Sequence, residues 1–128
     1  RKQQDGDPLI KSRLRERMRQ ILNQNMLQNV PKADVVITNP THYAIGLGWD
    51  NEVMNAPTVL AKGMDHMALK IREVAEENQI PMVENKPLAR ALYSSVEVGD
   101  EVPEEYWRIV SSILAEIYRM NGKLRTAG

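Results

Sequence analysis

Apolar side chains recur every three or four residues between Asp7 and Pro31, the spacing that gathers them on one face of a helix. Asp7 can cap the first turn, Pro8 suits the first helical position, and the helix should end before Pro31. The apolar stripe consists of Leu14, Met18, Ile21, Leu22 and Met26. A single helix cannot bury such a stripe, so we expect it either to dock on the rest of the chain or to rest on another surface.

The rest of the chain alternates between strand and helix patterns. Residues 35–38 form a continuous apolar run, which is typical of a strand buried on both faces. In residues 43–49 large apolar side chains alternate with Ala and Gly, so one face of this strand permits close approach by a helix or another backbone. Residues 58–61 and 80–83 predict two further strands, and Pro81 favours a sheet edge or a strand start.

Three helices complete the pattern of the body. The first carries an apolar stripe of Met64, Met67, Ala68, Ile71 and Ala75. A short helix opens at Pro87, and the last opens at Pro103 and ends at Gly122, with a stripe of Tyr106, Val110, Ile113, Ile117 and Met120. The third strand, the first of these helices and the fourth strand form a β-α-β unit, with parallel strands and a right-handed crossover. We therefore predict an α/β fold, a small mixed four-stranded sheet flanked by helices, preceded by a long basic N-terminal helix.

The composition fits one folded domain with an appendage. The chain has 128 residues, of which 42% are hydrophobic and 27% charged, and it contains no cysteine. Disulfides, thiolate catalysis and Cys-based metal sites are therefore excluded. No apolar run approaches the roughly 20 residues of a membrane helix, and no signal peptide opens the sequence, so we expect this chain to be soluble. It begins with Arg1 rather than Met, which is consistent with a piece of a longer protein.

The formal net charge of zero conceals a split along the chain. Residues 1–34 carry eight Lys or Arg against four Asp or Glu, whereas residues 35–128 carry nine against thirteen. A basic helical arm can contact anionic lipid heads, nucleic acid or an acidic partner, or it can simply be a solvated helix face. No aromatic side chain accompanies these arginines, so a stacking platform for nucleic acid is missing.

The tetrapeptide Asn39-Pro40-Thr41-His42 separates the first two predicted strands. A tight hairpin favours Asn-Gly or Asp-Gly, whereas Pro40 lacks a backbone N–H and pushes Asn39 out of the helical region. Because the Pro40 nitrogen has no proton to lose, it cannot attack the Asn39 side chain. The reverse attack remains open: the Asn39 side-chain nitrogen adds to the Asn39 main-chain carbonyl, closes a succinimide and expels Pro40 as a new N-terminus. The motif can therefore cut its own chain.

Such a cyclisation needs help, because an amide nitrogen is a poor nucleophile. A strained turn must aim it at the carbonyl, a base must remove its proton, and the departing Pro40 nitrogen needs a proton donor. Thr41 and His42 are close enough to assist, and a free imidazole titrates near pH ~6.5. Equally, His42 can merely hold the turn by hydrogen bonding, and most Asn-Pro bonds in turns stay intact.

Little in the sequence supports a turnover enzyme. The only histidines are His42 and His66, and neither a Gly-rich phosphate loop nor a G-x-S-x-G motif is present. Asp65 and His66 lack a third ligand at a metal-site spacing, so we predict a helix start beside a surface histidine, with no metal and no cofactor. The alternatives from the residues are single-turnover self-cleavage, a binding module in which the tetrapeptide is only a turn, and a nucleic-acid binder.

Five segments carry a resemblance to a known family. They are "DGDPLIKSRLRERMRQ", "VPKADVVITNPTHYAIGL", "APTVLAKGMDHMALKIRE", "IPMVENKPLARALY" and "VPEEYW". Together they cover nearly the whole chain, and they resemble the cytoplasmic domain of the FlhB/YscU export-switch family. The fit is closer to the flagellar branch than to the virulence-injectisome branch.

The resemblance implies the cytoplasmic tail of an integral inner-membrane protein of the bacterial type III export apparatus. Residues 1–30 would be a basic juxtamembrane linker helix, 31–122 an autocleaving export-switch domain and 123–128 a C-terminal tail. The linker accounts for the charge split without nucleic acid. In the family, cleavage occurs within the motif formed here by Asn39, Pro40, Thr41 and His42.

The same resemblance implies what cleavage does and which partners take part. Cleavage permits the switch from rod-and-hook cargo to filament cargo under the influence of a secreted length-control (hook ruler) protein. The implied partners are that protein, exported flagellar substrates, and membrane and cytoplasmic components of the apparatus. Early cargo would dock at Ala56 and Pro57, beside Ser111 and Leu114 of the last helix. The alternative is a non-cleaving binding module of a secretion apparatus.

Overall fold

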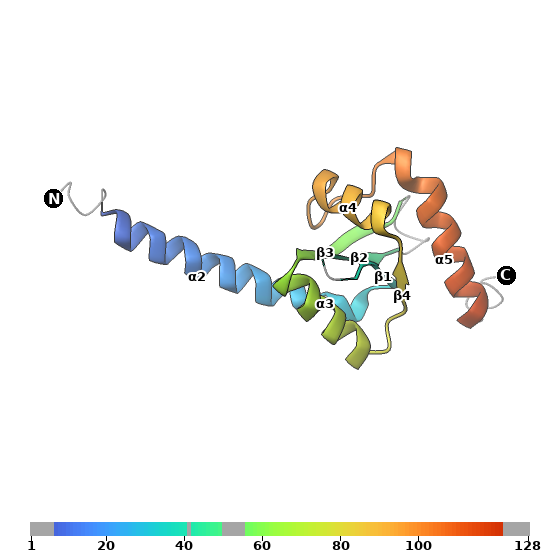
Figure 1. Ribbon diagram of the computed structural model, residues 1–128, viewed down its shortest axis with the longest axis horizontal. Coiled ribbons are helices and arrows are strands. Elements are labelled where there is room, and N and C mark those ends of the chain that lie inside the picture. Colours follow the sequence, from blue (N-terminus) through green and yellow to red (C-terminus); the bar gives the residue numbers. More distant parts are fainter. Residues whose placement is uncertain (1–6, 41, 50–55, 122–128) are drawn as a thin grey trace.

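The structure is a computed structural model that describes residues 7–40, 42–49 and 56–121. Four α-helices and a four-stranded mixed sheet confirm the predicted α/β fold (Figure 1). The helices are α2 (Pro8–Leu27), α3 (His66–Glu77), α4 (Lys86–Ser95) and α5 (Trp107–Asn121), with short 3₁₀ turns at Val30–Lys32 and Glu104–Tyr106. The strands are β1 (Val35–Asn39), β2 (Tyr43–Gly48), β3 (Thr58–Met64) and β4 (Met82–Glu84).

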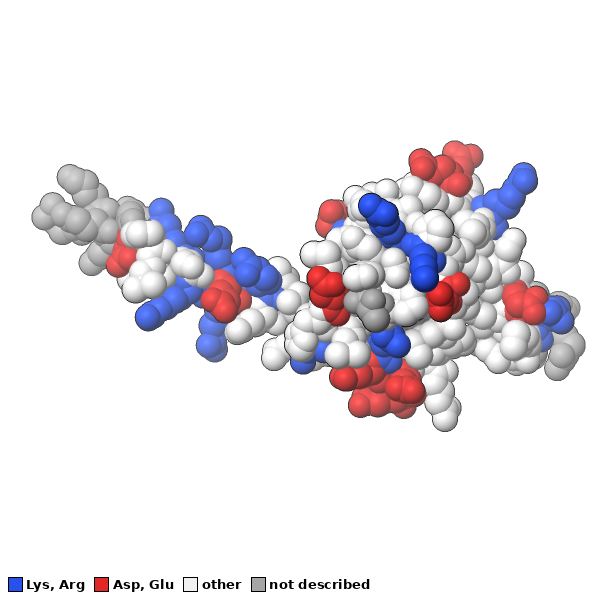
Figure 2. All heavy atoms as spheres, in the orientation of Figure 1, with Lys and Arg blue, Asp and Glu red and all other residues white. Residues whose placement is uncertain are grey.

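Helix α2 extends away from the body and touches it only near its C-terminal end (Figure 1). The Asp7 side chain accepts hydrogen bonds from the backbone N–H groups of Leu9 and Ile10, which confirms the predicted cap. Met26 and Leu27 pack against the body, whereas Leu14, Met18, Ile21 and Leu22 are exposed. Within the described part of the chain, the stripe is therefore uncovered except at Met26, and no helix there is both long and apolar enough to cross a membrane. Figure 2 shows Lys and Arg gathered along α2.

Strand β1 lies inside the sheet, between β2 and β4. The strand order is β3-β2-β1-β4, with β1 antiparallel to β2 and parallel to β4, and β2 antiparallel to β3. β3 and β4 therefore run in the same direction, as predicted, but two strands separate them. Pro81 directly precedes β4 at the sheet edge, which also agrees with the prediction.

Two element boundaries differ from the sequence prediction. β3 continues to Met64, where the prediction had already begun a helix, because Met64 pairs with Tyr43 of β2. The edge strand β4 covers Met82–Glu84 rather than residues 80–83, since its pairing with β1 begins at Met82. Sheet pairing thus overrides the apolar periodicity that placed Met64 on a helix.

The buried face of α5 is wider than predicted: Tyr106, Val110, Ile113 and Ile117 of the predicted stripe pack on the core, as expected, and further residues join them. Leu114 and Tyr118, which the predicted stripe omitted, are buried together with Val110 and Ile117. Met120 was assigned to the stripe but is 72% exposed. The helix also begins later than predicted, because residues 104–106 after Pro103 form a 3₁₀ turn and α5 starts at Trp107. The predicted end at Gly122 lies outside the described residues.

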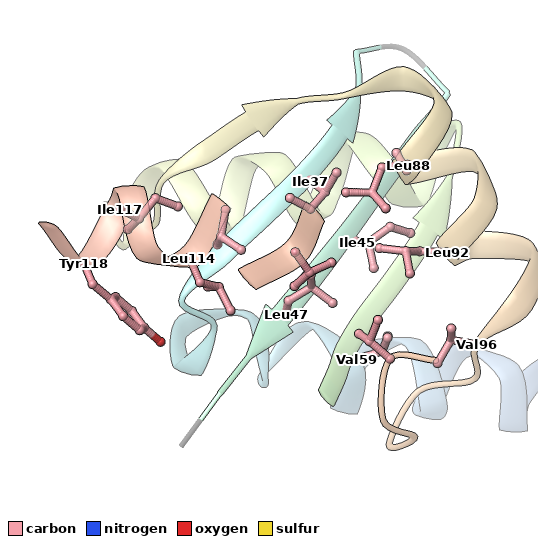
Figure 3. Packing of buried hydrophobic residues seen from close by; sticks show 14 residues of the cluster. Ile37, Ile45, Leu47, Val59, Leu88, Leu92, Val96, Leu114, Ile117 and Tyr118 are labelled. Atoms are coloured by element: carbon pink, nitrogen blue, oxygen red, sulfur yellow. The ribbon is translucent and has the colours of Figure 1, made fainter. Parts of the chain in front are cut away.

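Hydrophobic cores cover both faces of the sheet. On one face, helices α4 and α5 pack over β1, β2 and β3, and their side chains meet those of Ile37, Ile45 and Leu47 (Figure 3). On the other face, α3 packs over the small residues of β2 and β3, and Val36 of β1 belongs to the same core. The alternation predicted for β2 is confirmed, since Ile45 and Ala44 belong to opposite cores. β1 therefore contributes buried side chains to both cores.

We expect Ile37→Ala to lower the free energy of unfolding by about 2–5 kcal/mol, because Ile37 is fully buried and the substitution leaves a cavity. Urea unfolding measures this loss. The control is Ile109→Ala, since Ile109 is 40% exposed on α5. A similar loss in both variants would contradict the assignment of Ile37 to the main core.

Candidate functional site

The predicted cleavage motif begins at the end of β1 and closes a turn into β2. Asn39 is the last residue of β1 and pairs with Tyr43 of β2. The backbone N–H of His42 donates a hydrogen bond of 2.8 Å to the carbonyl oxygen of Asn39. Thr41 lies outside the described residues. The carbonyl that cyclisation would attack is thus already held by a backbone donor.

Helix α3 and Asp65, the residue before it, hold the turn from one side. The Arg72 guanidinium donates a hydrogen bond to the Pro40 carbonyl, and the Asp65 N–H donates one of 2.8 Å to the His42 carbonyl. The imidazole Nδ1 of His42 lies 3.7 Å from a carboxylate oxygen of Asp65. The residues on both sides of position 41 are therefore tied to the body.

Backbone strain lies opposite the cleavage motif rather than at its first residues. Asp65 has φ 53° and ψ −113°, a conformation that side-chain-bearing residues seldom adopt, whereas neither Asn39 nor Pro40 has a positive φ. Such a conformation persists only where the surroundings impose it. Asn39 and Pro40 therefore do not show the strain that was predicted for the turn, and the positive φ lies instead at Asp65, which bonds to His42.

Solvent reaches the histidine of the motif. The side chains of His42 and Asp65 are 65% and 69% exposed, so water screens their ion pair and the imidazole can exchange protons with solvent. Asn39 and Pro40 are partly buried.

A separate surface hollow lies on each side of the Asn39–Pro40 bond. One is lined by Pro40, Asp65, His66, Leu69 and Arg72. The other is lined by Asn39, Lys86, Pro87, Arg90, Ala91 and Ser94. The two residues of the bond therefore face different surroundings, and the described residues on the Asn39 side include two cationic residues of α4 and no acidic one.

The predicted cargo surface is assembled in part. A hollow brings together Pro57, Ser111 and Leu114, while Ala56 is buried beside Pro57 and does not line it. The remaining lining residues are Trp49, Ala115 and Tyr118. The Trp49 and Tyr118 rings stack with their centroids 6.2 Å apart, which gives the hollow an aromatic wall that the sequence prediction missed.

Other residues near the predicted cleavage motif were not identified from the sequence. Arg72 lies 32 positions from Pro40, and no short-range spacing links the two. Lys86 and Arg90 stand four residues apart on α4, a spacing that can be read from the sequence. Their position beside Asn39 follows only from the fold. Within the described ranges, no three His, Cys, Asp or Glu side chains gather as a metal site.

We expect Arg72→Ala to loosen the turn, because the Pro40 carbonyl loses a charged donor worth about 1.5–3 kcal/mol. Amide hydrogen exchange at His42 should become faster, measured in an Asn39→Ala background that keeps the backbone intact. Lys70→Ala on the exposed side of α3 is the control. Unchanged exchange in the Arg72 variant would show that this contact does not anchor the turn.

Comparisons with known proteins agree on one family. A family model described as "FlhB HrpN YscU SpaS Family" matches residues 1–117. The flagellar biosynthetic proteins FlhB of Borreliella burgdorferi and Bacillus subtilis are 55% and 54% identical to the chain over 123 residues, or 96% of it. The chain spans only 33% and 34% of their lengths.

Solved structures show the same fold. The cytoplasmic domain of FlhB from Shewanella putrefaciens matches with a TM-score of 0.74 and 38% identity, covering 83% of this chain and 81% of that one. A mutated EscU C-terminal domain matches with a TM-score of 0.69 and 33% identity, covering 72% and 92%. The sequence and the fold together show that this chain belongs to the FlhB/HrpN/YscU/SpaS family.

Proposed function

We propose that this chain is the cytoplasmic part of a flagellar type III export switch protein and that it cuts itself once, between Asn39 and Pro40. The observation that carries the proposal is the hydrogen bond from the His42 N–H to the Asn39 carbonyl. This donor polarises the carbonyl carbon that the Asn39 side chain must attack. It also stabilises the negative charge that develops on the oxygen, as backbone donors do in oxyanion holes.

The proposed reaction is cyclisation followed by hydrolysis. Nδ2 of Asn39 forms a bond to the Asn39 main-chain carbon and gives up a proton. The bond from that carbon to the Pro40 nitrogen breaks, and the nitrogen takes up a proton. Water then opens the succinimide at either carbonyl, leaving C-terminal asparagine or isoasparagine on residues 1–39. Either form of residues 1–39 carries one new carboxylate, and Pro40 becomes the amino terminus of the other fragment.

His42 contributes through its backbone and its side chain in different ways. Its N–H and C=O are both used in holding the turn, on Asn39 and Asp65 respectively. The imidazole is therefore not required for those two contacts, and we assign to it the exchange of protons during cyclisation. Its exposure allows it to return to its starting protonation state through solvent.

The two products should stay together after the cut. β1 remains paired with β2 on one side and β4 on the other, and Val35, Val36 and Ile37 are fully buried. Each buried side chain of this kind contributes roughly 1.5–3 kcal/mol. Cleavage would therefore change the loop and its mobility without dissociating the domain.

The proposed biological role is to change which proteins are exported, from rod and hook to filament subunits. The full protein would reside in the bacterial inner membrane with this part on the cytoplasmic face, α2 leading from the membrane. The hollow beside Trp49, Pro57 and Leu114 would receive early cargo, and a length-control protein would govern the change. The similarity to FlhB proteins and to FlhB and EscU domain structures supports this role.

Asn39→Ala should abolish cutting and leave the fold intact, because the nucleophile is lost while the strand pairing remains. Intact mass of the denatured protein should show two fragments for the original chain and a single one for the variant. The control is Asn78→Ala, since Asn78 is not followed by proline. A cut that persists in Asn39→Ala would point to a contaminating protease, and an original chain that stays whole would leave the motif as only a turn.

His42→Ala should slow cutting by about 10²–10⁴-fold, the range that general acid–base groups supply. The substitution keeps the backbone N–H, so some cleavage should remain. The rate is followed by mass over time at neutral pH. His66→Ala is the matched control, since His66 lines the neighbouring hollow but makes no ion pair with Asp65 among the described residues. Equal rates for His42→Ala and the original chain would remove the imidazole from the mechanism.

A further inference from the structure

The two sides of the Asn39–Pro40 bond differ in charge, and the difference matters once the bond is cut. Of the described residues that line the hollow on the Asn39 side, two are cationic, Lys86 and Arg90, and none is acidic. Glu84, which lies opposite Thr38 in the parallel pairing of β1 and β4, does not line it. This hollow is therefore a concave surface with two cations beside the residue that would carry the new carboxylate.

Among the described residues, neither Lys86 nor Arg90 has an ion-pair partner in the intact chain. Both side chains are exposed. They stand four residues apart on α4, so they are neighbours on the helix surface, where like charges at this spacing repel each other. An anion placed between them would relieve that repulsion.

Cleavage would supply such an anion at this place. Before the cut, Asn39 presents only neutral amide groups; after it, residues 1–39 end in a carboxylate, whichever succinimide carbonyl water attacks. β1 is held between β2 and β4, so the new end cannot move far from α4. An attached group acts at a high effective concentration, so even an exposed ion pair becomes well populated.

We propose that Lys86 and Arg90 form a binding site for the carboxylate that self-cleavage creates at Asn39. The proposal rests on the proposed self-cleavage, and it gives that reaction a means of fixing the cut state. In the cut protein, Lys86 and Arg90 of α4 would hold the end of β1 by ion pairs. In the intact chain, no ion pair between described residues joins α4 to β1. The new carboxylate would balance one of the two positive charges that line this hollow.

The test uses one double variant that carries both Lys86→Gln and Arg90→Gln. The effect of the two substitutions is measured in the cut protein and in the intact protein. In the cut protein at low salt, the association constant of the two fragments, obtained from urea unfolding, should fall about three- to tenfold, the range for two exposed ion pairs. In an intact Asn39→Ala background the same substitutions should leave the unfolding equilibrium unchanged or slightly favour folding, because only repulsion is lost. The loss in the cut protein should shrink in 1 M salt, where the Debye length is about 3 Å.

The matched control is a double variant that carries both Lys70→Gln and Arg108→Gln. Both residues are exposed cations on other helices, Lys70 on α3 and Arg108 on α5. Equal losses in cut and intact protein, equal losses in this control, or no loss in the cut protein would overturn the carboxylate site. Intact mass identifies the state of every sample. A chain that never cuts overturns the proposed function and this inference with it, whereas a cut chain without the charge effect overturns the inference alone.

Discussion

The pairing of β1 with a strand on each side is the constraint on which the site depends. β1 bonds to β2 and β4 and gives buried side chains to both cores, so its position cannot shift without disturbing both. Asn39 is the last residue of β1, so the strand pairing of β1 ends there. A reactive residue at the end of such a strand is held firmly on one side while the chain beyond it turns. The same pairing keeps the two proposed products together.

The turn itself is held by groups that are distant in sequence. Arg72 reaches Pro40 from α3, and Asp65, in an unfavourable backbone conformation, bonds to His42. The Asn39 side faces α4 and its two cations instead. A single peptide bond thus lies between surroundings of different charge, so the proposed cut would alter the surface while the fold persists.

Much of this architecture follows from sequence patterns, and the exceptions have physical causes. The alternation of Ile45 with Ala44 gave the two faces of β2 correctly, because strand periodicity directly assigns side chains to faces. Periodicity does not give the width of the helix face that the body covers, so the burial of Tyr118 was missed. Contacts such as Arg72 with Pro40 depend on tertiary packing, which no local pattern encodes. The cleavage motif was recognisable from its chemistry, but the groups around it were not.

The central claim is that the Asn39 side chain, rather than water or a protease, breaks the bond to Pro40. Tandem mass spectrometry of the new C-terminus on residues 1–39 tests it most directly. Cyclisation predicts an early species lighter by one water, followed by a mixture of asparagine and isoasparagine ends. A fragment that carries only ordinary C-terminal asparagine from the earliest time, or a chain that stays intact, would contradict the account.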